Sequence, residues 1–288
     1  MRESHLPISA LFARNADSID RLKYKRNISA LGSILFLAGS AVASPLAARV
    51  ARRAGVSRPN MRVGPKASQS NDAEQSSNWA GAVLVSSGFT GVSGTFTVPT
   101  PQIPSGGDQS TQYCATAWVG IDGDTCSTSI LQTGVDFCIQ GSDVSFDAWY
   151  EWIPANSVDF SGISFSAGDS VSVSVVATSK TTGTATITNN SNGQSVTHKF
   201  TSSETTSSLC ETNAEWIVED FTIISSSGQQ SLAPFANFGT VTFTDAAAVK
   251  NGNQVDASGA NTISLVDGNG NVLAAPSVDG STITVTYQ

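Results

Sequence analysis

Alternation of apolar and polar residues at every second position is the feature of this sequence that most limits its fold. The clearest runs cover residues 92–98, 171–175, 240–244 and 283–287. Side chains of a strand point alternately to its two faces, so each run predicts a strand with one buried face and one solvated face. Turn-rich stretches such as 104–107 separate the runs, and no segment has a helical period with caps. The pattern predicts an all-β domain, either an antiparallel sandwich or a barrel.

The charge of the chain is divided very unevenly. The first 66 residues hold 12 of the 15 Lys and Arg but only 3 of the 23 Asp and Glu, so the chain from residue 67 onward has 3 basic and 20 acidic residues, a formal charge of −17. Such a body is not expected to bind nucleic acids, which need basic side chains. The acidity is either a solubility surface or an adaptation to acid. We favour adaptation, because the loss of bases exceeds what solubility requires.

Residues 1–43 have the pattern of a secretory signal peptide with a long n-region. Lys23, Lys25 and Arg26 precede an apolar run at 28–43 that ends in an A-x-A cleavage pattern. Gly and Ser interrupt this run, which makes a transmembrane anchor the weaker interpretation. We therefore expect a secreted, extracellular protein that does not act in a membrane.

Few residue types remain for catalysis. His198 is the only histidine after residue 66, and the motifs G-x-S-x-G and H-E-x-x-H do not occur, which disfavours a serine triad or a zinc protease. The four cysteines are Cys114, Cys126, Cys138 and Cys210. Their even number in a secreted chain indicates two disulfides, and their spacing does not fit a zinc site. We expect no metal or other cofactor, and catalysis by carboxylates and carboxamides.

Three segments combine acids and carboxamides with tryptophan, at residues 117–137, 146–152 and 209–221. The residues that share a strand face within them are Ile130, Gln132, Gly134 and Asp136; Asp147, Trp149 and Glu151; and Asn213, Glu215, Ile217 and Glu219. A sheet face lined in this way indicates a substrate groove. The alternative is an ordinary solvated face above core aromatics.

These segments resemble the glutamic peptidases, or eqolisins. The matching strings are AWVGIDGDTC, ILQTG, DAWYEW, DFSGI and TNAEWIVEDF, within a stretch from Ser77 to Asp245. The resemblance implies an antiparallel two-sheet β-sandwich of the concanavalin A-like lectin and glucanase type. It also implies a secreted acid endopeptidase that acts on polypeptides, that pepstatin does not inhibit, and whose catalytic dyad is Gln132 and Glu215.

The chemistry of the two residue types suits peptide hydrolysis in acid. As general base, Glu215 would deprotonate water and then pass the proton to the leaving amine. Gln132 would donate hydrogen bonds to the oxyanion without titrating. The plainer alternatives are a hydrogen-bonded groove residue for Gln132 and a solvated carboxylate for Glu215.

The resemblance also implies a supporting set of groove residues and a disulfide pairing. The implied substrate-binding residues are Trp79, Trp118, Asp136, Asp147, Trp149 and Glu151. Core packing is the alternative role for Trp118 and Trp149. The implied disulfides are Cys114–Cys138 and Cys126–Cys210, and the second would tie the GIDGDTC loop to the strand that carries Glu215.

Residues 44–73 are predicted to be the basic pro-segment of a zymogen, ahead of a catalytic domain at 74–288 that we expect to be a monomer. Positions 44–66 carry six basic residues, no acid and no strand pattern. We expect the segment to lie over the acidic groove around Glu215, Asp136 and Glu151 and to leave it in acid, when the attraction weakens. The alternative is a disordered leader that only assists secretion.

A glycan-hydrolysing or glycan-binding sandwich is the competing function. Asp147 and Glu151 lie four residues apart on one strand, which at about 3.3 Å per residue is roughly 13 Å. Glycoside hydrolases hold their two carboxyl groups about 5–9.5 Å apart. A lectin would need oxygen ligands gathered in one loop, and residues 121–124 (IDGD) are a candidate that lies within the peptidase match.

Overall fold

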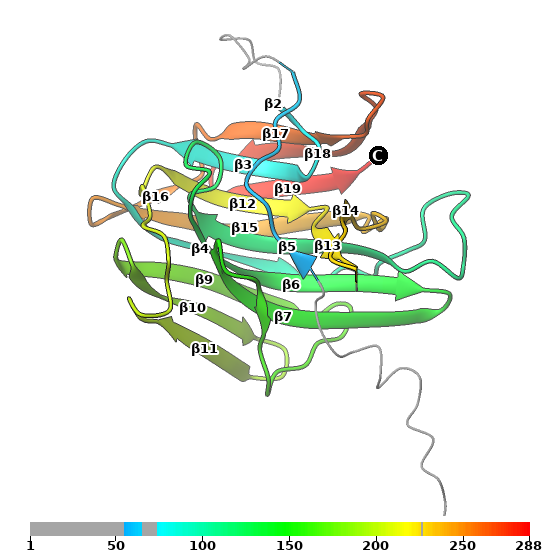
Figure 1. The fold of residues 1–288 in the computed structure, drawn as a ribbon, viewed down its shortest axis with the longest axis horizontal. Coiled ribbons are helices and arrows are strands. Elements are labelled where there is room, and N and C mark those ends of the chain that lie inside the picture. Colours follow the sequence, from blue (N-terminus) through cyan, green and yellow to red (C-terminus); the bar gives the residue numbers. More distant parts are fainter. Residues whose placement is uncertain (1–54, 65–73, 226) are drawn as a thin grey trace, which may run out of the picture. The chain divides into compact units, whose positions relative to one another are not determined.

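The computed structural model describes residues 55–64, 74–225 and 227–288 (Figure 1). All of them lie in the second of the two units into which the chain divides, Ala43–Gln288. The predicted signal peptide and most of the predicted pro-segment lie outside these residues. The described parts contain 19 strands and no helix, and so no helix long and apolar enough to span a membrane.

Two antiparallel layers face each other, as the sandwich prediction requires. The first layer has the order β11 (Gln194–Phe200), β10 (Thr182–Asn189), β9 (Ser170–Ser179), β4 (Phe89–Thr97) and β15 (Thr240–Lys250), with β16 (Asn253–Asp256) paired to β15. The second has the order β3 (Trp79–Val85), β12 (Asn213–Glu219), β5 (Tyr113–Ile121), β6 (Ile130–Gln140), β7 (Asp143–Ile153) and β8 (Val158–Asp159).

The layers are joined along one side by a continuous hydrogen-bonded path. This path runs from β15 through β19 (Thr282–Tyr287), β18 (Val272–Asp279) and β17 (Asn261–Val266) to β3. A short strand, β2 (Glu74–Ser76), pairs in parallel with β17. A separate small sheet consists of β1 (Gly55–Val56), β13 (Thr222–Ile224) and β14 (Gln230–Leu232).

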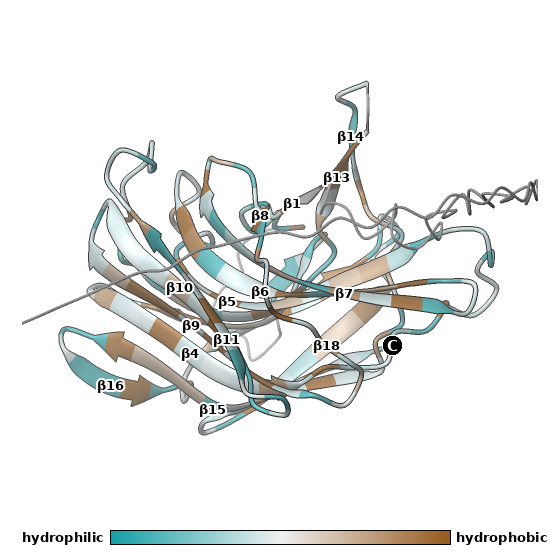
Figure 2. Cartoon of the chain, turned by 90° about the horizontal axis from the view of Figure 1, so that it is seen from below, coloured by the Kyte–Doolittle hydropathy of each residue, from teal (hydrophilic) through white to brown (hydrophobic). Residues whose placement is uncertain are grey.

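The main core lies between the layers and follows the predicted alternation. On β9, Val171, Val173 and Val175 are buried, whereas the serines between them are partly exposed. They join the core cluster that contains Phe96 and Phe243, whose rings meet edge to face. Figure 2 shows the resulting bands of hydrophobic and hydrophilic residues along the strands. Burying one face of each strand in this way drives the layers together.

A short strand forms within the predicted pro-segment although the sequence pattern there does not indicate one. The sequence shows no strand pattern at 44–66, yet Gly55 and Val56 form β1 and pair with Ile223 and Thr222 of β13. A strand of two residues is too short to show alternation. It exists because an open strand edge is available for pairing, which the sequence of the segment itself does not reveal.

Candidate active site

The outer face of the second layer carries three rows of side chains that run across its strands. The register places Glu151, Gln132, Gly120, Glu215 and Val83 in the first row. The second row contains Trp149, Gly134, Trp118, Ile217 and Gly81. The third contains Asp147, Asp136, Thr116, Glu219 and Trp79. Pairing between strands thus gathers segments that lie far apart in the sequence on a single face.

Gly120 separates Gln132 from Glu215 in the first row. Neighbouring strands lie about 4.8 Å apart, so the backbones of these two residues are roughly 10 Å apart. A Cβ atom on Gly120 would lie 2.9 Å from the Trp118 ring and 3.3 Å from Cβ of Gln132. The missing side chain therefore lets the Trp118 ring lie close to the backbone between the two polar residues.

Gln132 is held by its other neighbour in the row. Its Nε2 donates a 2.7 Å hydrogen bond to Oε2 of Glu151, and both side chains are buried. A primary amide nitrogen carries two hydrogens, so this bond uses one donor and orients the second.

The second row supplies an apolar wall that lies outside the main core. Trp79, Trp118, Trp149 and Ile217 belong to a separate cluster of fully buried side chains. Trp118 packs against Gly134, where a Cβ would come within 2.5 Å of the Trp118 Cβ. The tryptophans predicted to line a groove are therefore fully buried in this face.

Indole hydrogen bonds lock this wall to the third row. Nε1 of Trp118 donates to Oε2 of Glu219 at 2.9 Å, and Nε1 of Trp149 donates to the Thr116 hydroxyl at 3.0 Å. Trp79 meets Trp118 edge to face, with ring centroids 5.0 Å apart. These contacts fix the tryptophan rings in one arrangement.

Glu215 is the most strongly perturbed acid of the face. It is fully buried, and its carboxylate oxygens make no hydrogen bond of normal geometry with a described residue. Burial raises its pKa well above the usual value, and the charges of Asp124, Asp122 and Glu219 raise it further. The nearby backbone N–H of Asp124 acts in the opposite direction. Glu215 therefore keeps its proton to a higher pH than an ordinary glutamate.

A second acidic group lies at the far end of the third row. Burial, together with the charges of Asp136 and Asp159, raises the pKa of Asp147 to about 6. Asp136 and Asp147 are direct cross-strand partners, and Asp159 of β8 lies opposite Trp149. This end of the groove therefore also favours protonated carboxyl groups in mild acid.

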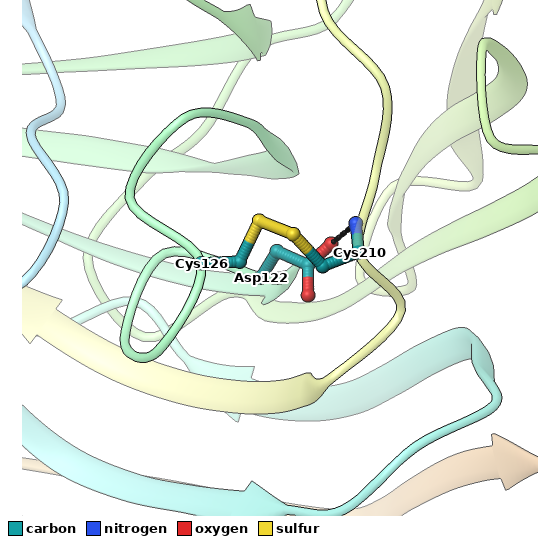
Figure 3. Close-up of side chains that lie close together, drawn as sticks. All are labelled: Asp122, Cys126 and Cys210. Carbon is teal, nitrogen blue, oxygen red and sulfur yellow. Dashed lines mark hydrogen bonds between the residues drawn. A yellow bond between two sulfur atoms is a disulfide. The ribbon is translucent and has the colours of Figure 1, made fainter.

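The loop after β5 is fastened to the start of β12 by Asp122 (Figure 3). The buried Asp122 carboxylate accepts hydrogen bonds from the backbone N–H groups of Cys210, Glu211, Thr212 and Asn213, at 2.7, 2.9, 2.8 and 3.3 Å. Asp122, Cys126 and Cys210 lie close enough together to suggest a metal site, but the two sulfurs form a disulfide. Their grouping is a structural junction, because the carboxylate is bound to backbone donors. The same bonds argue against the lectin-type calcium loop.

Both implied disulfides are confirmed, as Cys114–Cys138 and Cys126–Cys210. The first links β5 to β6. The second closes the junction at Asp122 and ties the loop after β5 to the segment that leads into Glu215.

Residues 55–64 lie along this face on the side of β12. The backbone N–H of Arg58 donates to Oε1 of Glu219 at 3.1 Å, and that of Asn60 donates to the carbonyl of Gly123 at 3.0 Å. Asn78 donates from Nδ2 to the carbonyls of Arg58 and Pro59, at 3.2 and 3.4 Å. The segment thus contacts β12 at Glu219 and the loop after β5 at Gly123, and both of these elements adjoin Glu215.

The structure brings the predicted residues together on one face, although they come from five strands. The first row contains Gln132, Glu215 and Glu151. The second row contains Trp118 and Trp149. The third row contains the remaining predicted residues, Trp79, Asp136 and Asp147. Sequence reasoning missed Gly120 and Asp124. Both lie within the string GIDGD. The only feature that could have pointed to Gly120 is its place between the strands that carry Gln132 and Glu215.

Comparison with known proteins identifies the family of the chain. The profile of the peptidase A4 family matches residues 77–287. Aspergillopepsin-2 of Aspergillus niger is 49% identical over 276 residues, which cover 87% of this chain and 95% of that protein. Scytalidopepsin B of Scytalidium lignicola is 44% identical over 252 residues, with coverage of 86% and 91%.

Solved structures agree with the sequence matches. A crystal structure of scytalido-glutamic peptidase with a peptide-based transition state analogue matches with a TM-score of 0.66 and 44% identity, covering 74% of this chain and 98% of that one. Aspergilloglutamic peptidase from Aspergillus niger matches with a TM-score of 0.57 and 55% identity, covering 61% and 99%. The chain belongs to the peptidase A4 (eqolisin) family and is a glutamic-type endopeptidase.

Proposed function

We propose that Gln132 and Glu215 are the catalytic pair of this endopeptidase and that it works in acid. The observation that carries the proposal is the first row, in which the two side chains lie on either side of Gly120, which has no side chain of its own. Gln132 can donate hydrogen bonds, and Glu215 has a raised pKa. Peptide hydrolysis requires both capacities on either side of one carbonyl.

The reaction follows from these positions. Glu215, as a carboxylate, takes a proton from water while the water oxygen bonds to the carbonyl carbon of the substrate. The free N–H of Gln132 donates to the oxyanion as the C=O double bond opens. Glu215 then gives its proton to the amide nitrogen, the C–N bond breaks, and an acid and an amine leave. Glu151 positions Gln132 by holding the other hydrogen of its amide.

The catalytic assignment is tested by Glu215→Gln, with Asp143→Asn as the control. Asp143 is an exposed carboxylate at the remote end of β7. Glu215→Gln should abolish cleavage of a quenched peptide in acid, because it removes the base and keeps the shape. Asp143→Asn should leave turnover unchanged. Near-normal turnover by Glu215→Gln would overturn the mechanism.

Gln132→Ala provides a separate measurement of the proposed oxyanion donor. Loss of one such donor lowers kcat by about 10²–10³-fold. The loss should fall on kcat more than on KM, because the charge on the oxygen develops in the transition state. An equal rise in KM with unchanged kcat would assign Gln132 to substrate binding instead.

The supporting roles are proposed on the same basis. Trp79, Trp118 and Trp149 form the apolar wall that receives substrate side chains, while Asp136 and Asp147 form its acidic end. Rings that pack edge to face and are hydrogen-bonded are held rigidly enough to shape such a groove.

The segment before residue 74 is proposed to keep the enzyme inactive as its pro-segment. Contacts of Arg58 and Asn60 on either side of Glu215 support this role. The carbonyls of Arg58 and Pro59 accept hydrogen bonds from Asn78, which adjoins β3. Asn78, and not Gln132, therefore binds these two carbonyls of the segment, as expected for a segment that is not cut at this point.

Release of the segment in acid is the remaining part of this proposal. The segment is basic and the body carries −17, so their attraction weakens as carboxylates take up protons. Secretion after removal of residues 1–43, and a monomeric mature enzyme, stay predictions. Terminal sequencing of the secreted protein and its mass in solution would test them.

A further inference from the structure

A group of aromatic rings joins the two layers where the hydrogen-bonded path of strands ends. This path ends at β11 in the first layer and at β8, beside β7, in the second. The ring of Tyr150 on β7 stacks on the ring of His198 on β11, with centroids 4.0 Å apart and planes at 9° to each other. Phe160 and Phe200 pack against Tyr150, with centroids at 4.7 and 5.7 Å. Ring packing therefore connects the layers here, whereas strand pairing connects them through β17, β18 and β19.

His198 is also bound to a carboxylate that is itself held in place. Its Nε2 lies 3.0 Å from Oε1 of Glu204. The other oxygen of Glu204 accepts hydrogen bonds from the backbone N–H and the hydroxyl of Thr201, at 3.2 and 3.3 Å. Burial raises the pKa of Glu204, but the bonds from Thr201 and the charge of His198 outweigh this effect and keep the pKa below its usual value. Glu204 therefore remains ionised in mild acid, where a histidine ring ordinarily carries a positive charge.

Glu204 is the charged group that faces His198. On β7 the ring meets Tyr150, whose pKa is raised by burial and by the charge of Glu204, so that it stays neutral in acid and at neutral pH. On β10 the residue opposite His198 is Ala185, which does not titrate. Lys199 follows His198 along β11 but lies on the opposite, exposed face. A change in the charge of His198 therefore acts mainly on its bond to Glu204 and on the stacked Tyr150 ring.

Tyr150 lies between two groove residues on β7. Trp149 and Glu151 precede and follow it, and alternation along the strand places them on the opposite face. β7 is the outermost long strand of its layer, because its other neighbour, β8, pairs only with Trp149 and Tyr150. Glu151 in turn accepts the 2.7 Å hydrogen bond from Nε2 of Gln132. A contact that fixes Tyr150 from inside the sandwich therefore affects how Glu151 holds Gln132.

We propose that His198 is a positioning residue of this peptidase: as a cation bound to Glu204, it fixes Tyr150 and thereby keeps Glu151 bonded to Gln132. The inference rests on the proposed role of Gln132 as the oxyanion donor. A positively charged ring attracts both a carboxylate and the face of an aromatic ring, and both attractions weaken when the charge is lost. A histidine ordinarily loses that charge as the pH rises through about 6.5. The groove is therefore held most firmly in acid, by the only histidine that the chain has after residue 66.

The first test compares kcat at about pH 5, between the ordinary pKa values of carboxyl groups and of histidine. His198→Phe keeps an aromatic ring without the charge and should lower kcat by about twofold to fivefold, the range that a partly exposed ion pair can supply. His198→Arg keeps a flat cation that can bind Glu204 and stack on Tyr150, so it should retain the wild-type kcat. Lys199→Gln, which removes the neighbouring exposed cation, is the control and should change nothing. KM should change little in every variant, because the bond from Gln132 to the oxyanion forms in the transition state.

The kcat values are expressed per folded molecule, so that a loss of stability alone does not count. Glu204→Gln should show the same loss as His198→Phe, and the double variant should lose no more than either, because both changes remove one interaction. Unchanged kcat in His198→Phe would overturn the proposal. An equal loss in His198→Arg, or losses that add in the double variant, would overturn it as well, because the paired charge would then not be the cause.

A second measurement follows Gln132 without catalysis. In Glu215→Gln protein, NMR measures how fast the side-chain amide hydrogens of Gln132 exchange with solvent, with and without His198→Phe. The ratio of the two rates cancels the intrinsic pH dependence of exchange. The protein that retains His198 should exchange about twofold to fivefold more slowly in acid, and the ratio should approach one above about pH 6.5. A ratio of one at every pH would overturn the role of His198 and leave the dyad intact, whereas failure of the dyad would appear separately, as activity of Glu215→Gln.

Discussion

At the scale of single residues, Gly120 decides whether the proposed dyad can accept a substrate. Its neighbours in the row are Gln132 and Glu215, and an added Cβ would lie 2.9 Å from the Trp118 ring. The tryptophan is fixed by its bond to Glu219, so it cannot move aside without breaking that contact.

Gly120→Ala should therefore lower kcat/KM by at least about tenfold, since displacement of catalytic groups by about 1 Å costs as much or more. Gly268→Ala is the matched control, because a Cβ there would meet nothing within 4 Å. The measurement is kcat/KM per folded molecule, with folding checked by circular dichroism. Unchanged kinetics in Gly120→Ala would show that the close approach of Trp118 to this position does not matter for catalysis.

Asn189, Asn190 and Ser191 form an N-glycosylation sequon, which gives a second prediction at this scale. Asn189 is buried, and its Nδ2 donates to the Ser164 carbonyl and the Asp169 carboxylate, at 2.9 and 2.8 Å. A glycan on this nitrogen would replace one of those bonds and need space that the fold does not leave. Mass spectrometry of the protein from a glycosylating host should find Asn189 unmodified. A glycan at full occupancy would contradict the burial.

Much of the site could be predicted residue by residue, but not the contacts that complete it. Alternation showed which residues of each strand share a face, and the resemblance identified Gln132 and Glu215. The hydrogen bond from Trp118 to Glu219 joins residues about 100 positions apart, and the one from Arg62 to Asp124 joins residues about 60 positions apart. Such contacts depend on how distant strands pair, and alternation within one strand carries no information about its partners.

At the scale of elements, β12 is the strand whose placement matters most. It carries Glu215 and pairs with β3 and β5 along its whole length. Its start is fixed twice, by the hydrogen bonds to Asp122 and by the Cys126–Cys210 disulfide. The two devices act on different states: the disulfide mainly restricts the unfolded chain, and Asp122 holds the folded register.

This difference predicts two distinct outcomes. Replacing Cys126 and Cys210 together by serine should lower the free energy of unfolding by about 2–4 kcal/mol and leave kcat/KM per folded molecule nearly unchanged. Asp122→Ala should lower both, because it leaves buried backbone donors unpaired next to Glu215. Urea unfolding and peptide kinetics would separate the two variants. A fully active Asp122→Ala would mean that the strand pairs alone set the register.

At the scale of the whole molecule, burial and net charge act on stability in the same direction. Burial raises the pKa of Glu215 and of Asp220 well above the usual values, and raises that of Asp147 to about 6. The folded protein therefore binds these protons more tightly than the unfolded chain. The stabilisation that comes from binding these protons is complete below the ordinary carboxyl pKa. It is lost as the pH rises through the pKa values that the three carboxyl groups have in the folded protein. The charge of −17 adds repulsion over the same range.

The melting temperature of the protein from residue 74 onward should therefore fall between about pH 4 and about pH 8. Gln132→Ala in the background prevents self-digestion during the measurement. Asp147→Asn should flatten the part of the decline near pH 6, because Asp147 no longer titrates there, and the exposed Asp143→Asn should not. Added salt should raise the melting temperature more at the upper end, where repulsion is strongest. A melting temperature that stayed level or rose with pH would show that hydrogen-bonded carboxylates outweigh both effects, and the adaptation to acid would then lie in the catalytic groove alone.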